Sequence, residues 1–273
     1  MLLISLMGLF DVHAHLTHPD LFADIEGVIA RAEAAGLSTI ISNGLNPADN
    51  AAVADLARRF PIVKPAFGLY PVDAVLSEML AAGESYPGQR EAWPARVAID
   101  WVRDHLDEAF AVGEIGLDGH WVKEAFWPAQ DDAFRELVRL AMGAGKAIII
   151  HTRKRERRTL ELLDELGARR VNWHCFTGRL SLAREIIKRG HYISIPANVR
   201  RSESFTRMLE ALPREQLLLE TDSPYLGPEK DTQNEPANVR STAAFAAELW
   251  KTSEAGAAAQ LAQNFEALFG VAP

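Results

Sequence analysis

The chain has 273 residues, 48% of them apolar and 24% charged, and its formal net charge is −8. This is the composition of an ordinary globular protein, and the length suits either two small domains or one α/β barrel. The negative charge argues against attraction of nucleic acid by the molecule as a whole, although it permits a local basic patch.

The apolar opening, MLLISLMGLF, differs from a signal peptide because it lacks a basic start and a small-residue cleavage site before DVHAHL. We interpret it as the first strand preceded by a few extra residues, with Met7 as an alternative start. No stretch approaches the roughly 18 consecutive apolar residues of a membrane span, so no membrane association is expected. A single cysteine, Cys175, excludes an intramolecular disulfide and makes the cytoplasm the expected location.

Apolar, strand-like runs alternate with amphipathic segments along the chain. Strands are expected near residues 8–13, 38–43, 62–68, 109–115, 147–151, 171–175, 191–195 and 217–221. Glycines that end several of the intervening helices are Gly36, Gly145, Gly167 and Gly190. Alternating strands and helices pair in parallel through right-handed crossovers, and eight such units in about 250 residues are typical of a TIM barrel. We therefore predict one (β/α)8 barrel domain over residues 1–273.

The residues after the first strand, residues 73–105 and the residues from about 240 onward refine this prediction of the fold. A doubly wound open sheet is the structural alternative, but it would carry a glycine-rich turn after its first strand, where this chain has HAHL. Residues 73 to 105 are the least regular and predict an expanded loop with two helices around a Pro/Gly break. From about residue 240 the chain is alanine-rich and predicts helix.

Side chains of metal-ligand type stand at or just after the ends of the predicted strands. They are His13, His15, Glu114, His151, His174 and Asp222. The carboxyl ends of all strands of a barrel meet at one end, so the sequence predicts a metal centre there. Asp11 shares one strand face with the first two histidines, and we expect it to orient a ligand rather than to bind the cation directly.

Each of these residues alone has a plainer explanation, as a hydrogen-bonded histidine or as a carboxylate in an ion pair. Together they favour metal chemistry, in which Glu114 can bridge two cations and Asp222 can both ligate and accept a proton from bound water. Glu220 is expected on the same strand face as Asp222 and is a further candidate metal ligand. Cys175 is expected to pack on the side of the strand opposite His174, and Ser223 lacks the G-x-S-x-G surroundings of a nucleophile.

Mixed histidine and carboxylate ligands suit Zn²⁺, Mn²⁺, Fe²⁺ or Mg²⁺. Such a centre lowers the pKa of bound water and supplies a hydroxide nucleophile near neutral pH. Two cations about 3.5–4 Å apart would hold both the attacking and the leaving oxygen of a phosphodiester. The sequence therefore predicts a metal-dependent hydrolase.

A basic run begins two residues after His151 and comprises Arg153, Lys154, Arg155, Arg157 and Arg158. Cations are unfavourable at a helix N-terminus, so this run predicts a bound anion such as a substrate phosphate. Arg179 and Arg200 follow two later strands and are expected on the same face. The alternative is a solvated helix start with Glu156 and Glu161 in local ion pairs.

Trp121, which follows EIGLDGH, is expected either to stack on a base at the site or to fill a long loop as a buried aromatic.

Several motifs in this order and spacing resemble those of the TatD family of metal-dependent deoxyribonucleases, part of the amidohydrolase-like superfamily: DVHAHL, GEIGLDGHW, IIIHTR, HCFTG, ETDSPYL and NEPANV. The resemblance spans residues 9 to about 245 and implies a (β/α)8 barrel with up to two divalent cations, such as Zn, Mg or Mn. It implies one cation held by His13, His15, Glu114 and Asp222, and another held by Glu114, His151 and His174, with Glu114 as the bridge.

The activity implied by the resemblance is hydrolysis of DNA phosphodiester bonds by metal-bound hydroxide, often from the 3′ end of a single strand. Asp222 would take the proton, and Arg153 would help to stabilise the transition state. DNA is then the expected partner, and no obligate protein partner is indicated. The competing hypotheses are a barrel hydrolase of a small phosphoester, amide or lactone, and a barrel without catalytic activity.

Two positions depart from the family pattern. The family usually has Gly-x-His-Pro after the third strand, whereas this chain has GLYP with Tyr70, which keeps an oxygen donor but cannot shuttle protons near neutral pH. Gln233 stands where relatives often carry an arginine, which predicts the loss of one phosphate contact. The expected substrate-binding residues are Arg153, Tyr70, Trp121, Arg179 and Arg200.

Overall fold

The computed structural model describes residues 8–88 and 91–273, and its strands form one eight-stranded parallel sheet in the order β1 to β8. The strands are β1 (Leu9–Ala14), β2 (Leu37–Asn43), β3 (Val63–Phe67), β4 (Ala111–Asp118), β5 (Ala147–Arg153), β6 (Val171–Trp173), β7 (Tyr192–Ile195) and β8 (Leu217–Leu219). The predicted TIM barrel and its eight strands are confirmed, with ends that differ by a few residues. The expectations for residues 1–7, including a start at Met7, lie outside the described residues.

The barrel is nearly closed between β8 and β1 by backbone bonds just beyond the end of β8. The N–H of Asp222 donates to the carbonyl of His13 at 2.9 Å, and the N–H of His15 donates to the carbonyl of Ser223 at 2.9 Å. One oxygen of the Asp11 carboxylate accepts the N–H of Thr221 at 2.9 Å, while the other accepts the hydroxyl of the same residue. Closure therefore fixes the backbone of residues that carry candidate ligands.

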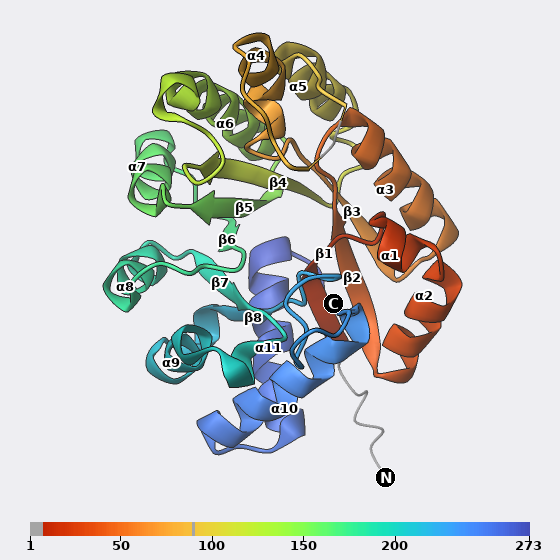
Figure 1. Cartoon of the computed structure of the whole chain (residues 1–273). Coiled ribbons are helices and arrows are strands. Elements are labelled where there is room, and N and C mark those ends of the chain that lie inside the picture. Colours follow the sequence, from red (N-terminus) through yellow and green to blue (C-terminus); the bar gives the residue numbers. More distant parts are fainter. Residues whose placement is uncertain (1–7, 89–90) are drawn as a thin grey trace.

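Helices surround the strands on the outside of the barrel (Figure 1). They are α1 (Pro19–Phe22), α2 (Ile25–Ala34), α3 (Pro47–Arg59), α4 (Leu76–Ala81), α5 (Ala95–Asp104), α6 (Trp127–Gly143), α7 (Glu156–Leu166), α8 (Leu180–Lys188), α9 (Glu203–Ala211), α10 (Val239–Trp250) and α11 (Glu254–Phe269). The two helices expected between residues 73 and 105 are α4 and α5, and the helical C-terminal stretch is α10 and α11. None of the helices in the described part of the chain is long and apolar enough to span a membrane.

Glycines end several helices, as the sequence predicted. Gly36, Gly145, Gly167 and Gly190 have φ values of +93°, +65°, +72° and +80°. These left-handed conformations are strained for side chains with a Cβ atom, so glycine lets the chain turn sharply from each helix toward the next strand.

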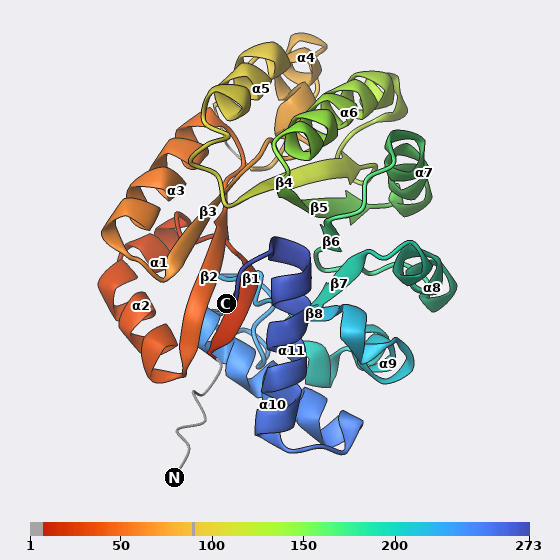
Figure 2. The same cartoon turned by 180° about the vertical axis from the view of Figure 1, so that it is seen from behind.

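The amino-terminal end of the barrel is closed by α11, which lies in front of the strands in Figure 2. Phe265 of α11 packs against Phe10 at the start of β1, with ring centroids 4.8 Å apart. Phe269 stacks on Phe110, just before β4, at 5.3 Å. Asn264 donates to the carbonyl of Leu217 at the start of β8 at 2.8 Å. This end is filled by apolar side chains, which leaves the carboxyl end, called the mouth from here on, as the open one.

Candidate metal centre at the barrel mouth

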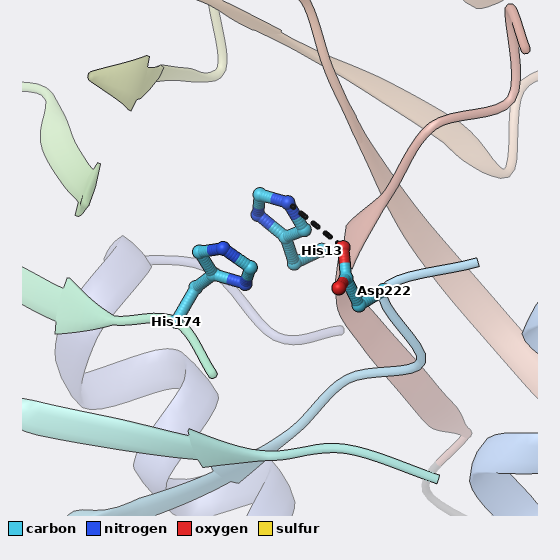
Figure 3. Close-up of side chains that lie close together, drawn as sticks. All are labelled: His13, His174 and Asp222. Atoms are coloured by element: carbon cyan, nitrogen blue, oxygen red, sulfur yellow. Dashed lines mark ion pairs between the residues drawn. The ribbon is translucent and has the colours of Figure 1, made fainter. Parts of the chain in front are cut away.

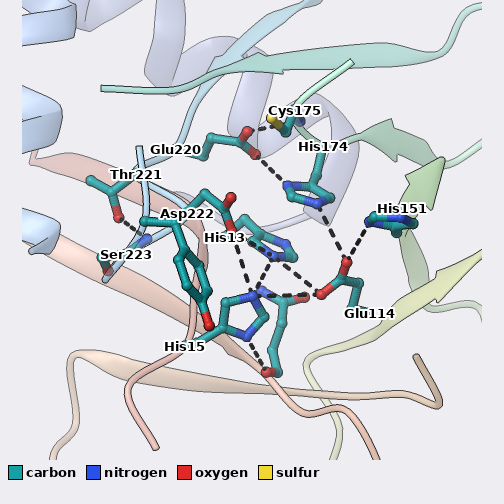
Figure 4. Close-up of polar contacts among 12 residues, drawn as sticks. His13, His15, Glu114, His151, His174, Cys175, Glu220, Thr221, Asp222 and Ser223 are labelled. Carbon is teal, nitrogen blue, oxygen red and sulfur yellow. Dashed lines mark hydrogen bonds and ion pairs between the residues drawn. The ribbon is translucent and has the colours of Figure 1, made fainter. Parts of the chain in front are cut away.

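The six side chains expected to bind metal meet at the mouth (Figure 4). Their positions are His13 in β1, His15 just after it, Glu114 in β4, His151 in β5, His174 just after β6 and Asp222 shortly after β8. Five strands far apart in sequence thus deliver side chains to one place, because parallel strands of a barrel end together. His13 is fully buried and Glu114 is 2% exposed, whereas Asp222 faces the open cavity above them.

One oxygen of Glu114 faces His13 of β1 and His15, which lies just after that strand. Its Oε2 atom lies 3.5 Å from Nε2 of His13 and 3.5 Å from Nε2 of His15. Oδ1 of Asp222 lies 3.7 Å from Nε2 of His13 (Figure 3) and 3.5 Å from Nε2 of His15. Two imidazole nitrogens and two carboxylate oxygens therefore converge on one small volume.

The other oxygen of Glu114 faces a second pair of histidines. Its Oε1 atom lies 3.0 Å from Nδ1 of His151 and 3.4 Å from Nε2 of His174. The ligand atoms of Glu114, His151 and His174 all lie within 4.8 Å of one another, as do those of His13, His15 and Glu114. Glu114 is thus shared between two groups that could each hold a cation.

The outer nitrogens of three histidines face oxygen atoms. Nδ1 of His15 lies 3.2 Å from the carbonyl of Asn43, and Nε2 of His151 lies 3.0 Å from Oδ2 of Asp118. Nδ1 of His174 lies 3.5 Å from Glu220. Metal-binding histidines typically make such contacts, which fix the ring and leave the inner nitrogen free to ligate. The residues present therefore fit a divalent cation that accepts nitrogen and oxygen ligands.

Nδ1 of His13 differs from these three nitrogens, because it is buried with neither a hydrogen bond nor an ion-pair contact to an acidic side chain. The ring of His13 is held instead by stacking on the ring of His174, with centroids 3.7 Å apart and planes 10° apart.

Asp118 supports the site and was missed by the sequence analysis. One of its oxygens contacts His151, and the other accepts the N–H groups of His120 at 2.7 Å and of Trp121 at 2.8 Å. A signal was available, because Asp118 lies four residues after Glu114 and strand alternation places both on one face. Asn43, at the end of β2, was missed as well, because it contacts His15 through its backbone carbonyl, which a residue of any type would supply.

Glu220, which the sequence marked as a further candidate, lies behind the ligand set. Its carboxylate accepts the N–H of Cys175 at 2.8 Å and the hydroxyl of Ser194 at 2.6 Å. It contacts the outer nitrogen of His174 rather than the converging atoms. Asp11 similarly contacts backbone, accepting the N–H of His13 at 3.1 Å.

The buried carboxylates at the centre are held in the charged form by neighbouring histidines. Burial acts to raise the pKa of Glu114, but hydrogen bonds with His13, His151 and His174 hold it well below its usual value. Burial likewise acts to raise the pKa of Asp222, but its hydrogen bond with His15 leaves that pKa lowered. Both residues are therefore carboxylates near neutral pH, the form that metal binding requires.

The histidines respond to burial and to these carboxylates in different ways. Burial lowers the pKa of His13 to about 4, which keeps the ring neutral. Burial also acts to lower the pKa of His151 and of His174, but contacts with acidic side chains, Asp118 for the first and Glu220 for the second, raise both. A cation entering this group would take the place of the protons on these rings.

An open cavity of about 730 Å³ lies over the ligand set, and Tyr70, Trp121 and Arg153 line it. The ring of Tyr70 lies 5.0 Å from that of His151. Trp121 is 38% exposed, so the alternative that it is a buried loop-filling aromatic is wrong. The guanidinium of Arg153 lies 6.0 Å from the Trp121 ring.

The rest of the basic run does not face this cavity, contrary to the prediction of an anion-binding cluster. Arg155 pairs with Asp131 at 2.9 Å, and Arg158 pairs with the same carboxylate at 2.9 Å. Arg157 pairs with Glu185 of α8 at 2.7 Å. These three arginines connect α7 to its neighbouring helices, because acidic side chains on α6 and α8 lie within their reach. The alternative of local pairs with Glu156 and Glu161 holds only for Arg158, which also contacts Glu161 at 3.4 Å.

The other expected basic contacts also lie away from the cavity lining. Arg200 pairs with Glu248 of α10, stacks over Phe245 at 4.2 Å and does not line the cavity. Arg179 is exposed at the start of α8 and does not line the cavity. Gln233 donates to the carbonyl of Asp20 at 2.7 Å and so ties its loop to α1.

Cys175 lines the cavity, so the expectation that it packs on the opposite face of its strand is wrong. The strand β6 ends at Trp173, and Cys175 adopts a φ of +44°, which breaks the alternation. Burial raises the pKa of its thiol well above the usual value. The side chain is therefore a thiol rather than a reactive thiolate near neutral pH.

Comparisons with known proteins agree with this geometry. Residues 10–270 match the family model described as TatD related DNase. The human deoxyribonuclease TATDN3 is 31% identical over 89% of this chain and 88% of its own. The Bacillus subtilis metal-dependent hydrolase YabD, described as uncharacterized, is 30% identical over 96% and 99%.

Two further relatives resemble nearly the whole chain. The 3′-5′ ssDNA/RNA exonuclease TatD of Citrobacter rodentium is 32% identical over 96% of this chain and 98% of its own. The crystal structure of YJJV, a TatD homologue from Escherichia coli, superposes with a TM-score of 0.82 at 25% identity, covering 97% of this chain and 99% of that one.

Proposed function

Since the chain belongs to the TatD related DNase family, we propose that it is a metal-dependent deoxyribonuclease that cleaves phosphodiester bonds of single-stranded DNA, including bonds at 3′ ends. The observation that carries the proposal is the shared position of Glu114, whose two oxygens face different pairs of histidines. The family relationship makes the chain a hydrolase of ester bonds, and the open cavity above Glu114 leaves room for a polymer to reach the site.

We assign the ligands of two divalent cations, Zn, Mg or Mn, to the two groups around Glu114. His13, His15, Glu114 and Asp222 would hold one, and Glu114, His151 and His174 the other. The outer contacts of the histidines support this assignment, since they point the inner nitrogens at Glu114. When bound, the cations would supply charge stabilisation for the phosphoryl oxygens and a lowered pKa for a water molecule.

Asp222 is the proposed proton acceptor. Its carboxylate is ionised because its pKa is lowered, and it faces the cavity, where a water molecule and a substrate phosphate have access. The N–H of Asp222 donates to the carbonyl of His13, which ties its backbone to β1 and fixes where the carboxylate lies. Glu114 lies between the two pairs of histidines and so fixes the position of both ligand groups relative to Asp222.

Tyr70, Trp121 and Arg153 are the proposed substrate contacts on the cavity wall. Arg153 can pair with a phosphate, and Trp121 can stack on a base. Tyr70 occupies the position where the family usually has histidine, and its ring lies 5.0 Å from that of His151. A phenol hydroxyl can donate a hydrogen bond to a phosphate oxygen. We do not include Arg179 and Arg200 among the contacts, since neither lines the cavity.

The test compares metal-free protein with protein reloaded separately with Mg²⁺, Mn²⁺ or Zn²⁺. Each form is offered a 5′-labelled single-stranded DNA, the matching RNA and duplex, and a panel of small phosphoesters, amides and lactones. We expect metal-dependent cleavage of the DNA single strand and loss of cleavage with a chelator. Turnover of the panel alone would contradict the proposal, and a protein that binds no metal and turns over nothing would make the barrel non-catalytic.

A further inference from the structure

Two exposed aromatic side chains flank the ligand set from opposite sides of the mouth. Trp121 follows β4 and Tyr225 follows β8, and in an eight-stranded barrel of order β1 to β8 these strands lie across from one another. Both side chains line the cavity, and they are 38% and 51% exposed. An aromatic ring that remains exposed beside a catalytic site offers a flat face to a ligand.

The first aromatic group, called the Trp121 platform, consists of Trp121, Tyr86 and Arg153. The rings of Trp121 and Tyr86 meet edge to face with centroids 5.6 Å apart, and Arg153 lies 6.0 Å from the Trp121 ring. The backbone of Trp121 is anchored by Asp118, which also contacts His151. Asp118 therefore connects the backbone of this platform to the ligand set.

The second group, called the Tyr225 platform, consists of Tyr225 and His18. Their rings meet edge to face at 5.6 Å, and His18 follows β1, which lies across the barrel from the strand that carries Arg153. The N–H of Tyr225 donates to the carbonyl of Asp222 at 2.9 Å, and Asn234 donates to the carbonyl of Tyr225 at 2.6 Å. This platform too is held in place next to a candidate ligand.

The cavity lining carries more acidic than basic side chains, which leaves the aromatic faces as the main means of binding a single strand of DNA. Among the described residues that line it, Arg153 is the one arginine or lysine, whereas Asp49, Glu114 and Asp222 are acidic. Apart from bound cations, the cavity lining would therefore offer little positive charge to the phosphates of a DNA single strand. Stacking on aromatic rings, which tolerates any base, is the other means by which proteins hold single strands.

Resting on the proposed function, we propose that the Trp121 and Tyr225 platforms are two base-stacking subsites on either side of the scissile phosphate. The nucleoside on one side of the phosphate stacks on Trp121, and the nucleoside on the other side stacks on Tyr225. The smallest complete substrate is then a dinucleotide with both bases unpaired. A duplex does not fit, because its bases are stacked and paired with one another inside the helix.

The test uses four dinucleotides that have the same sugar–phosphate chemistry. They are dTpdT, its two forms with one thymidine replaced by the baseless tetrahydrofuran analogue, and the form with both replaced. Metal-loaded wild type is compared with Trp121→Ala and Tyr225→Ala. Trp121→Phe and Tyr225→Phe serve as conservative variants. The matched control is Phe22→Ala, an aromatic that is 45% exposed on α1 but does not line the cavity.

Each alanine variant should lower kcat/KM on dTpdT roughly fivefold to a hundredfold, and each phenylalanine variant should recover most of the loss. Trp121→Ala should show no loss on one singly baseless dinucleotide, Tyr225→Ala should show none on the other, and neither variant should differ from wild type on the doubly baseless one. Phe22→Ala should match wild type throughout.

Several outcomes would overturn the subsites while leaving the nuclease in place. These are equal kcat/KM of wild type on all four dinucleotides, losses in the alanine variants that persist without bases, and cleavage of long strands without cleavage of dTpdT. Failure of the proposed function is distinguishable, since wild type would then leave single-stranded DNA of every length intact while hydrolysing small esters, amides or lactones.

Discussion

The two ends of the barrel are built from opposite kinds of side chain. At the amino-terminal end, Phe265 and Phe269 of α11 pack against Phe10 and Phe110, and the interior is filled. At the mouth, buried histidines and carboxylates surround Glu114 beneath an open cavity. Packing at the first end contributes free energy of folding, whereas the mouth gathers charged groups whose burial opposes folding. The two tasks of stability and chemistry are thus separated along the barrel axis.

Two pKa values in β1 show how burial opposes charge near the ligand set. Burial raises the pKa of Asp11 to about 8, despite its hydrogen bonds to Thr221 and to the His13 backbone. Burial lowers the pKa of His13 to about 4. Both shifts disfavour the charged form, as expected for ionisable groups removed from water. Because the mouth carries the candidate ligands and the other end the aromatic packing, substitutions at the mouth should mainly change activity, and substitutions at the other end should mainly change stability.

The largest effect on activity is expected for Glu114→Gln, which keeps the shape of the side chain but removes the charge shared by the two histidine pairs. We expect a loss of kcat of at least about a thousandfold, roughly 4 kcal/mol in activation free energy, with bound metal reduced and Tm changed little. Activity assays, metal analysis and thermal unfolding check this. The control is Glu203→Gln, an exposed carboxylate on α9. Full metal content with wild-type turnover would refute the role of Glu114.

At the opposite end, Phe265→Ala should lower the free energy of unfolding by about 3–5 kcal/mol, because it leaves a cavity among the aromatic rings. The kcat of protein that remains folded should stay close to that of wild type. Denaturant unfolding and assays well below Tm measure the two quantities. Val271→Ala, at an exposed site near the same end, should change neither. A large loss of kcat in folded Phe265→Ala would mean that the two ends are coupled.

A smaller effect is expected for Asp118→Asn, which weakens the hold on His151 while keeping an oxygen for the N–H groups of His120 and Trp121. Loss of such an outer contact typically reduces metal affinity or activity by about 10- to 100-fold. Metal titration and kinetics at saturating metal separate the two. Asp132→Asn on α6, at a carboxylate 83% exposed, is the control. Unchanged metal affinity and unchanged rate would remove Asp118 from the site.

The smallest effects distinguish two arginines that lie four residues apart. Arg153→Ala should reduce kcat/KM on single-stranded DNA by roughly five- to twentyfold, because it removes the one arginine of the described cavity lining. Arg157→Ala should change it less than about twofold, since this side chain pairs with Glu185 on the outside of the barrel. Steady-state kinetics at several salt concentrations measure both. Equal losses in the two variants would restore the predicted basic cluster.

The sequence by itself determined the barrel and the six candidate ligands. Strand alternation and helix-ending glycines such as Gly167 are local properties, and residues at the carboxyl ends of parallel strands meet wherever those strands close into a barrel. For this reason His13, Glu114 and Asp222 could be placed together although they lie about a hundred residues apart in the chain.

Only the tertiary structure decided what surrounds those ligands. Arg157 faces away from the cavity because Glu185 lies on the neighbouring helix, and Arg200 does so because Glu248 lies on α10. The pairing of Asp118 with His151 and the position of Tyr225 across from Trp121 depend on which strands are neighbours and which are opposite. Such contacts depend on distances between separate elements, which no local pattern in the sequence encodes.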